Sequence, residues 1–236
     1  MKIAIMQPYF FPYLGYFSLM KHTDRFVLFD TVQFIRHGWI ERNRMLKQNE
    51  GWLYIQVPLI KAGRETKISE MRVDNRQDWA AKIIAQIQPY KKTAPYFRQT
   101  QQLLEDSITG NFEDIVSLNR YTLKAVCNYL GLTCNMDVFS EMNLSIEPAT
   151  APDEWALNIC KSLGNIEEYW NPPGGLTFFD RSKYANAGID LKFQAMELRP
   201  YDQKRPDFLP GLSILDVMMF NSPAEIMEML DNYTFI

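Results

Sequence analysis

The segment from Asp30 to Arg44 gathers side chains that could bind an anion and move a proton. Three arginines and an asparagine lie within nine residues: Arg36, Arg42, Asn43 and Arg44. Guanidinium groups bind phosphate or carboxylate through paired hydrogen bonds. The same segment holds His37, one of two histidines in the chain, and an imidazole titrates near neutral pH and can act as a general base.

Three neighbours of His37 add to this expectation. Asp30 and Gln33 could orient a hydroxyl or an amine, and Trp39 could stack on a planar or sugar ring. The alternative is a solvated β-hairpin with surface charges. We favour a functional site, with His37 and Asp30 as its catalytic residues, because the segment directly follows an apolar run that predicts a buried strand.

An aromatic segment near the start of the chain could line a ligand pocket. Six of the ten residues from Pro8 to Phe17 are aromatic, and two prolines restrict the backbone. The candidate binding residues are Gln7, Tyr9, Tyr13, Gly15 and Tyr16. A core plug between a strand and a helix is the alternative, but so many tyrosines beside a glutamine favour a ligand site.

Two later motifs carry less information. In Asn171–Gly175, two prolines precede Gly174 and Gly175, whose amides could approach a ligand, although the spacing is not that of a phosphate-binding loop. An ordinary turn explains this segment equally well. Further on, Ser213 is expected to cap the helix that carries Asp216, and we favour a structural role there.

Missing motifs restrict the chemistry. The three cysteines form no Cys-x-x-Cys pair and the two histidines are not spaced as ligands, so no metal site is expected. An odd number of cysteines fits a reducing cytosol, and we expect a cytoplasmic protein without a membrane span. The Gly-x-Ser-x-Gly motif of one hydrolase class is missing too.

The elements that must position these residues alternate between strands and helices. Apolar runs at 2–6 and 25–29 predict buried parallel strands around a helix at 13–22. Further strands are expected at 52–59, 67–73, 168–170 and 189–195. Further helices are expected at 78–90, 95–104, 112–130, 153–163, 181–186 and 223–230.

This order predicts an α/β fold with a parallel-sheet, Rossmann-like core. The core would comprise residues 1–75 and 145–236, with a helical insertion or subdomain at 76–132. Ligands of open parallel sheets bind beyond the carboxyl ends of the strands. The loops that start at Gln7 and Asp30 would lie side by side at that edge.

The composition excludes some classes of protein. The 236 residues are 47% hydrophobic and 22% charged, which is typical of globular proteins. With 25 Lys and Arg against 28 Asp and Glu, the net charge of −3 leaves no basic excess for binding nucleic acid. Four methionines near the C-terminus could serve the core or a homo-oligomer interface: Met218, Met219, Met227 and Met229.

The chain resembles the WbqC-like family. The resemblance lies in the opening residues 1–17, in His-Gly-Trp-x-x-Arg-Asn-Arg at 37–44, in the Pro-Gly turn at 172–175 and in Leu-Ser-Ile-Leu-Asp at 212–216. Some family members are encoded among genes for O-antigen or other surface-polysaccharide synthesis. The resemblance therefore implies work on activated sugars, but it brings no established set of catalytic residues.

A second, local resemblance is to pantothenate synthetases and their nucleotidyltransferase relatives, and it implies a nucleotidyltransferase-like core. There, His-x-Gly-His follows the first strand and binds nucleotide phosphates, and Asn-Pro-x-Gln-Phe at the second strand holds a carboxylic substrate. This chain has Tyr13-Leu-Gly-Tyr16 and Asp30-Thr-Val-Gln33-Phe34 at these places. Tyrosines thus replace both histidines, and a tyrosine supplies no cationic donor to a phosphate.

The two resemblances together imply amide formation. Pantothenate synthetases couple an activated carboxylate to an amine, and surface polysaccharides often contain acylated or aminoacylated amino sugars. We therefore predict an N-acyl or aminoacyl transferase, or an ATP-dependent ligase, that acts on the amine of a nucleotide-linked amino sugar, with a glycyl group as one example. ATP with Mg²⁺ is the cofactor expected of a ligase. The alternatives are a non-catalytic sugar-nucleotide or glycan-binding protein and a nucleotidyltransferase-like enzyme.

The predicted enzyme assigns a role to each candidate residue. The aromatic segment would shape the donor pocket, and Gln33 and Asp30 would hold the carboxylate or the amine. His37 would accept the amine proton, and Arg42 and Arg44 would hold phosphate or carboxylate. The partners expected are small molecules only: the nucleotide-linked amino sugar and an acyl or amino-acid donor.

Overall fold

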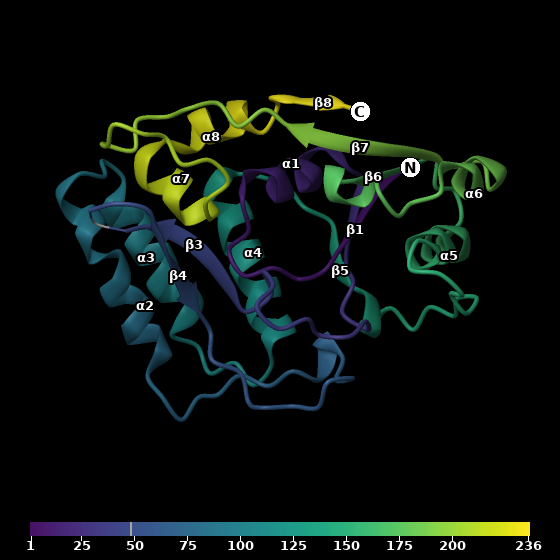
Figure 1. Cartoon of the computed structure of the whole chain (residues 1–236), viewed down its shortest axis with the longest axis horizontal. Helices are drawn as coiled ribbons and strands as arrows, with labels where there is room; N and C mark the ends of the chain where they lie inside the picture. The colour runs from purple at the N-terminus through teal and green to yellow at the C-terminus, as the bar shows by residue number, and fades with distance from the viewer. Residues whose placement is uncertain (48) are drawn as a thin grey trace.

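A mostly parallel sheet runs through the centre of the molecule (Figure 1). The computed structural model describes residues 1–47 and 49–236, and in it six strands pair in the order β5-β2-β1-β6-β7-β8. Their bounds are β1 Lys2–Met6, β2 Arg25–Leu28, β5 Met136–Val138, β6 Glu168–Asn171, β7 Asp190–Met196 and β8 Tyr233–Phe235. All neighbours pair in parallel except β7 and β8. The predicted Rossmann-like α/β class is thereby confirmed.

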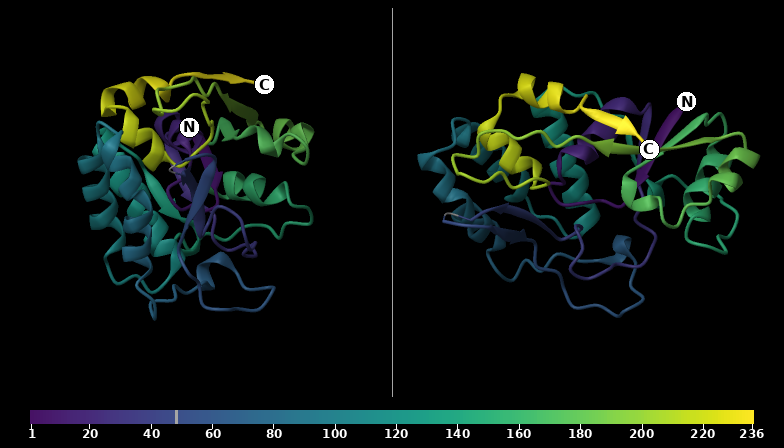
Figure 2. Two further views of the ribbon diagram at one scale, coloured as in Figure 1. Left: turned by 60° about the vertical axis from the view of Figure 1, so that its left-hand side comes forward. Right: turned by 45° about the horizontal axis from the view of Figure 1, so that its top comes forward.

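Both faces of the sheet are covered, which explains why β1 and β2 are largely apolar and buried. Side chains alternate along β1, so that Ala4 joins one apolar cluster while Ile3 and Ile5 join a second one. Helices α5 and α6 cover the second face (Figure 2). The other helices, α1 to α4, α7 and α8, form a larger helical group on the side of the first face. The bounds are α1 Leu14–His22, α2 Trp79–Ile87, α3 Phe97–Ile108, α4 Ile115–Leu130, α5 Glu154–Leu163, α6 Arg181–Asn186, α7 Ile214–Phe220 and α8 Pro223–Met229.

Serine side chains cap the N-termini of α7 and α8, as the sequence predicts. Ser222 accepts a hydrogen bond from the Glu225 amide, and the Glu225 carboxylate accepts one from the Ser222 amide, so the expected capping box opens α8. Ser213 caps α7 as predicted. Met218 and Met219 of α7 are fully buried, which places them in the core.

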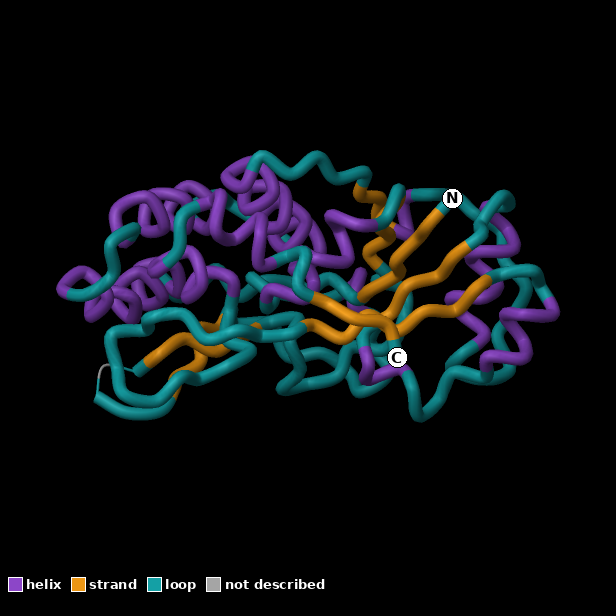
Figure 3. The backbone as a smooth tube through the Cα atoms, turned by 90° about the horizontal axis from the view of Figure 1, so that it is seen from above, coloured by secondary structure: helices purple, strands orange, loops and turns teal. Residues whose placement is uncertain are grey.

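A separate two-stranded hairpin lies beside the helical group (Figure 3). Its strands are β3, Arg42–Leu46, and β4, Trp52–Gln56, which pair in antiparallel register. The predicted strand at 52–59 is therefore shorter, and β3 was not among the expected strands, although a β-hairpin was the alternative considered for residues 30–44. Because β3 contains three of the candidate binding residues, the hairpin decides which of their side chains are exposed.

The prediction of a strand at 67–73 is wrong. A single 3₁₀ turn occupies Ile68–Glu70, and only isolated bridges flank it. The amides of Ile68 and Ser69 donate to the carbonyls of Val32 and Asp30, so the segment binds to a loop instead of a neighbouring strand. Ile68 and Met71 are buried and three residues apart, which suits one turn of helix, whereas only Met71 and Val73 have the spacing of a strand.

Helices α2, α3 and α4 contribute to the same apolar cluster as α1, α7 and α8. The boundaries of a helical subdomain at 76–132 stay a prediction. Within the described residues, no helix is both long enough and apolar enough to cross a membrane.

Candidate functional site

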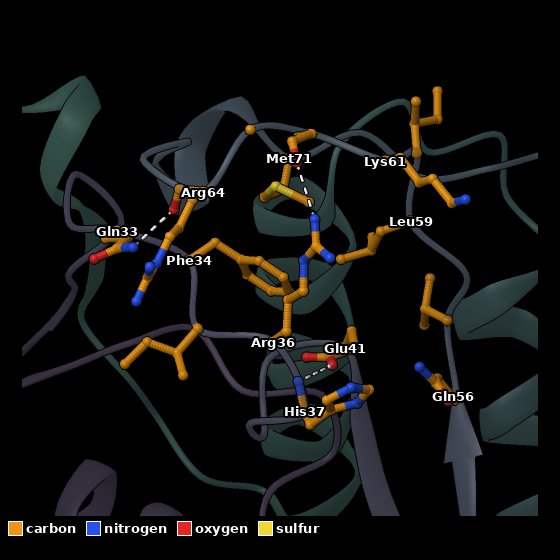
Figure 4. Close-up of a pocket in the computed structure, with 15 residues that line it drawn as sticks. Gln33, Phe34, Arg36, His37, Glu41, Gln56, Leu59, Lys61, Arg64 and Met71 are labelled. Carbon is orange, nitrogen blue, oxygen red and sulfur yellow. Dashed lines mark hydrogen bonds between the residues drawn. The ribbon is translucent and has the colours of Figure 1, made fainter.

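A cleft of about 740 Å³ lies between the loop that follows β2 and the loop that follows β4. Gln33 and His37 of the predicted site line it, together with polar residues that the sequence analysis did not select. Three cations contribute to the lining: Arg36, Lys61 and Arg64. Figure 4 shows His37 beside Glu41, facing the wall that carries Gln56, while Arg64 lies beside Gln33. The cleft thus combines an imidazole with three cations in a lining whose other residues are mostly apolar.

His37 has a left-handed backbone, with φ of 64°. Such a conformation is uncommon in residues other than glycine and requires support from the surrounding structure. The His37 amide donates to Glu41 Oε1 over 2.9 Å, and the His37 carbonyl accepts from Arg42 Nη2 over 2.5 Å. These two bonds hold the backbone that presents the imidazole to the cleft.

Glu41 is the acid of the cleft lining. Its side chain is 4% exposed, and its second carboxylate oxygen, Oε2, is buried without a hydrogen-bond partner among the described residues. Burying a carboxylate oxygen without a hydrogen-bond donor costs free energy. Glu41 bears this cost beside an imidazole and near arginines, so we count it among the functional residues of the cleft. The sequence analysis missed Glu41, because residues 37–41 form no helix and a spacing of four indicates proximity only on a helix.

The two walls of the cleft are joined by hydrogen bonds. Gln33 Nε2 donates to the Arg64 carbonyl over 2.7 Å, and Arg36 Nη2 donates to the Ala62 carbonyl over 3.0 Å. The loop of residues 61–66 is therefore held by side chains from the loop after β2. Lys61 and Arg64 were missed because their loop follows a different strand, and only the tertiary structure brings it opposite His37.

Asp30 does not line this cleft. It is 1% exposed, and its two carboxylate oxygens accept hydrogen bonds from the amide and the hydroxyl of Ser140, at 3.0 and 2.6 Å. Ser140 follows β5, the strand next to β2. Asp30 therefore ties two neighbouring strand ends together, and its oxygens are already engaged.

The aromatic segment after β1 packs into the core instead of the cleft. Tyr16 is fully buried, and its hydroxyl donates to the Gln7 carbonyl over 2.9 Å. Burial raises the pKa of Tyr9, Tyr13 and Tyr16, so their phenols stay neutral. At Gly15, an added Cβ would lie 2.4 Å from the Tyr13 hydroxyl, so the glycine makes room for that ring.

Asn43 holds the aromatic segment through hydrogen bonds to its backbone. It is buried, and its Nδ2 donates to the carbonyls of Phe10 and Phe11 at 3.1 and 2.9 Å. Its Oδ1 accepts from the Arg44 amide over 2.8 Å. Further hydrogen bonds hold the same segment, from Asn119 Nδ2 to the Pro8 carbonyl over 2.9 Å and from Ser213 Oγ to the Phe11 carbonyl over 2.8 Å.

The remaining candidates of β3 form a stack on its exposed face. The guanidinium carbon of Arg42 lies 3.9 Å from the Tyr54 ring centre, and that of Arg44 lies between Trp39 and Trp52, at 5.4 and 5.6 Å. Such cation–π contacts orient the guanidinium planes. This stack adjoins the cleft through Gln56, which pairs with Arg42 in the hairpin.

The glycine turn lies after β6, away from the residues that line the cleft. Gly175 is buried, and a Cβ there would lie 2.7 Å from both Asn171 Oδ1 and the Phe179 ring. Gly174 is exposed and has no neighbour within 4 Å of such a Cβ. The structure therefore explains one of the two glycines by packing.

Asp216 is the centre of a fully buried polar network. Tyr90 and Tyr201 donate their hydroxyls to its two carboxylate oxygens, and Gln203 donates a third bond over 3.2 Å. Burial raises the pKa of Asp216 to about 6, although these bonds oppose the shift. The network joins α7 to β3, because Leu46 donates its amide to the Tyr90 hydroxyl.

The fold and the cleft together define an α/β protein with a mostly parallel, doubly covered sheet and a small-molecule-sized cationic cleft after its second strand. The chain belongs to the WbqC-like protein family, whose model matches residues 7–228. An uncharacterized protein of Mycobacterium tuberculosis (strain ATCC 25618 / H37Rv), Rv1507c, is 29% identical over 232 residues, which cover 97% of each chain. No solved structure matches the chain.

Proposed function

We propose that this protein acylates the amine of a nucleotide-linked amino sugar in the synthesis of surface-polysaccharide precursors. The observation that supports it is the presence of His37 in the wall of a cleft that also contains Arg36, Lys61 and Arg64. A nucleotide-linked sugar carries a diphosphate, which such cations bind. Its amine must lose a proton as it attacks, which a neighbouring imidazole can accept.

The reaction forms one bond and breaks another at the acyl carbon. The amine nitrogen of the sugar attacks the carbonyl carbon of an activated acyl donor, and a carbon–nitrogen bond forms. The bond from that carbon to the leaving group then breaks, and the leaving group keeps the electron pair. His37 accepts the proton that the nitrogen loses. Glu41 holds the His37 amide and thereby the position of this base.

The residues that correspond to a phosphate-binding loop do not fit ATP. Tyr16 is buried and donates to the Gln7 carbonyl, and the Tyr13 ring packs against Gly15. Neither hydroxyl is part of a cradle for a triphosphate. We therefore derive no step through ATP and propose a donor that is already activated, such as an acyl thioester.

Amide formation is tested directly. Purified protein is incubated with UDP-linked amino sugars and acyl or aminoacyl thioesters, and the products are analysed by mass spectrometry. We expect a product whose mass equals that of the sugar nucleotide plus the acyl group minus one hydrogen atom. His37→Ala should lower kcat by about 10²–10⁴-fold with KM largely unchanged, because it removes a base and leaves the cleft cations in place.

Matched charge variants control this experiment. Arg36→Ala and Arg64→Ala should raise KM about tenfold or more, since each removes a charged hydrogen bond to the diphosphate. Arg98→Ala removes the same charge from an exposed position on α3, away from the cleft, and should have no effect. If no substrate pair yields an amide, or if His37→Ala retains full kcat, the proposal is wrong.

A sugar-nucleotide-binding protein without catalysis is the second candidate. The observation that favours it is the stack of Arg42 and Arg44 on aromatic rings, which is suited to binding and needs no base. The same variant separates the two candidates. In a binding protein, His37→Ala should retain most of the ligand affinity, and no turnover should accompany binding in the parent protein.

A further inference from the structure

The exposed face of the β3–β4 hairpin carries two arginines among aromatic rings. Side chains alternate along a strand, and the register places Arg44 opposite Tyr54 and Arg42 opposite Gln56 on this face. We refer to the following residues as the hairpin platform: Trp39, Arg42, Arg44, Trp52 and Tyr54. Residues of the opposite face, such as Asn43 and Ile55, are buried.

The cations of the hairpin platform are held in place by backbone carbonyls. Arg44 Nη2 donates to the Gly211 carbonyl over 3.0 Å, and Arg42 Nη2 donates to the His37 carbonyl. The Nε atoms of both arginines are buried and have no hydrogen-bond partner in the described part of the chain. The guanidinium groups therefore sit in fixed positions against the rings.

The indole rings of the hairpin platform are open to solvent. Trp52 is 42% exposed and Trp39 is 38% exposed, although a tryptophan gains more than most residues from burial. Two neighbouring exposed indoles with a guanidinium between them form a surface on which a planar ring can stack.

The hairpin platform is continuous with the cleft. Gln56 lines the cleft and pairs with Arg42 across the hairpin. His37 lines the cleft too, and its carbonyl accepts from the same arginine. Trp52 and Gln56 lie at opposite ends of β4, about 13 Å apart along the strand. A ligand that stacks a ring on the indoles would therefore place its anion beside Arg42, at the edge of the cleft.

We propose that the hairpin platform binds the base of a nucleoside diphosphate whose phosphates lie toward the cleft. The proposal rests on the proposed function, because it assigns a place to the nucleotide end of that substrate. Stacking of a base on an aromatic side chain contributes roughly 5- to 150-fold in affinity. The two fixed guanidinium groups favour an anionic ligand over a neutral glycan or an apolar protein surface.

The test compares the affinity of the protein for nucleoside diphosphates with its affinity for pyrophosphate, which has no base. Full-length protein is titrated by calorimetry with UDP, GDP, ADP and CDP separately, and with inorganic pyrophosphate as a probe that lacks a base. We expect at least one nucleoside diphosphate to bind about fivefold or more tightly than pyrophosphate. Trp52→Ala should remove this preference and leave the affinity for pyrophosphate unchanged.

Two further variants keep the result interpretable. Trp39→Ala should weaken the same preference, whereas Trp155→Phe, in α5 against Phe29 on the other side of the sheet, should not. Circular dichroism of each variant verifies the fold. Because Trp52 and Trp39 are both partly exposed, their removal is expected to leave the core intact.

Three results would overturn the proposal. The first is that no nucleoside diphosphate binds more tightly than pyrophosphate, and the second is that both tryptophan variants retain the preference. The third is self-association by sedimentation that Trp52→Ala abolishes, which would identify this face as a protein interface. None of these decides the proposed function, which fails separately if nucleoside diphosphates bind but no amide forms.

Discussion

At the scale of single residues, the same side-chain types serve the cleft and the core. His37, Arg36 and Arg64 lie in the lining of the cleft, whereas Asp30 and Asn43 are buried and hold loops by hydrogen bonds. Polarity alone does not distinguish these uses. What distinguishes them is exposure: the three cleft side chains are exposed, whereas Asp30 and Asn43 are buried with their polar atoms paired.

Asn43 allows this distinction to be tested. Asn43→Ala removes three hydrogen bonds in the core and should lower the free energy of unfolding by about 2–4 kcal/mol, measured by urea denaturation. Asn43→Asp should be at least as harmful, because it places a carboxylate against the carbonyls of Phe10 and Phe11. Asn111→Ala, at an exposed position, is the control. Unchanged stability with lost ligand binding would contradict the structural role.

At the scale of elements, the turn after β6 shows how packing selects a glycine. The backbone of Pro173–Gly175 forms a 3₁₀ turn, and Phe179 folds back onto it. Gly175 lies beneath that ring and Gly174 does not, although the two residues are adjacent.

The two glycines therefore predict opposite outcomes for one substitution. Gly175→Ala should destabilise the protein by about 1–3 kcal/mol, because its Cβ would overlap Asn171 and Phe179. Gly174→Ala should change the free energy of unfolding by less than about 0.5 kcal/mol. Thermal or urea unfolding of the pair gives the comparison. Equal losses for both variants would mean that the turn backbone, and not packing, requires glycine.

At the scale of the whole molecule, the Asp216 network joins segments that are distant in the sequence. It links α7 to Tyr90, to β3 and to Tyr201 and Gln203 in the segment before α7. The folded-state pKa of about 6 lies above the ordinary value for an aspartate. The folded state therefore binds more protons than the unfolded state between about pH 4 and pH 6, and this group lowers stability as pH rises through that window.

Tyr201→Phe tests this linkage. The variant loses a donor to the ionised carboxylate, so it should cost about 1.5–3 kcal/mol at pH 7.5. The cost should be smaller at pH 5, where Asp216 is largely protonated in the folded protein. Urea unfolding at both pH values, with the exposed Tyr121→Phe as control, measures the difference. A pH-independent cost would show that Asp216 does not titrate as described.

The sequence by itself determined the α/β class, the family and most helices and strands. Apolar runs such as Lys2–Met6 and capping residues such as Ser222 act through local contacts and burial, which a periodic pattern records. It also directed attention to His37 and Gln33, because both follow a buried strand. It misassigned 67–73, where the spacing of Met71 and Val73 indicates a strand but that of Ile68 and Met71 fits the turn that forms.

Only the tertiary structure decided which candidates share a site. Lys61 and Arg64 reach the cleft because the loop after β4 folds opposite the loop after β2, and no local pattern encodes that contact. Conversely, the tyrosines after β1 are drawn into the core, where burial of their rings outweighs exposure to a ligand. Sequence patterns record local preference and burial, whereas a binding site depends on which loops meet.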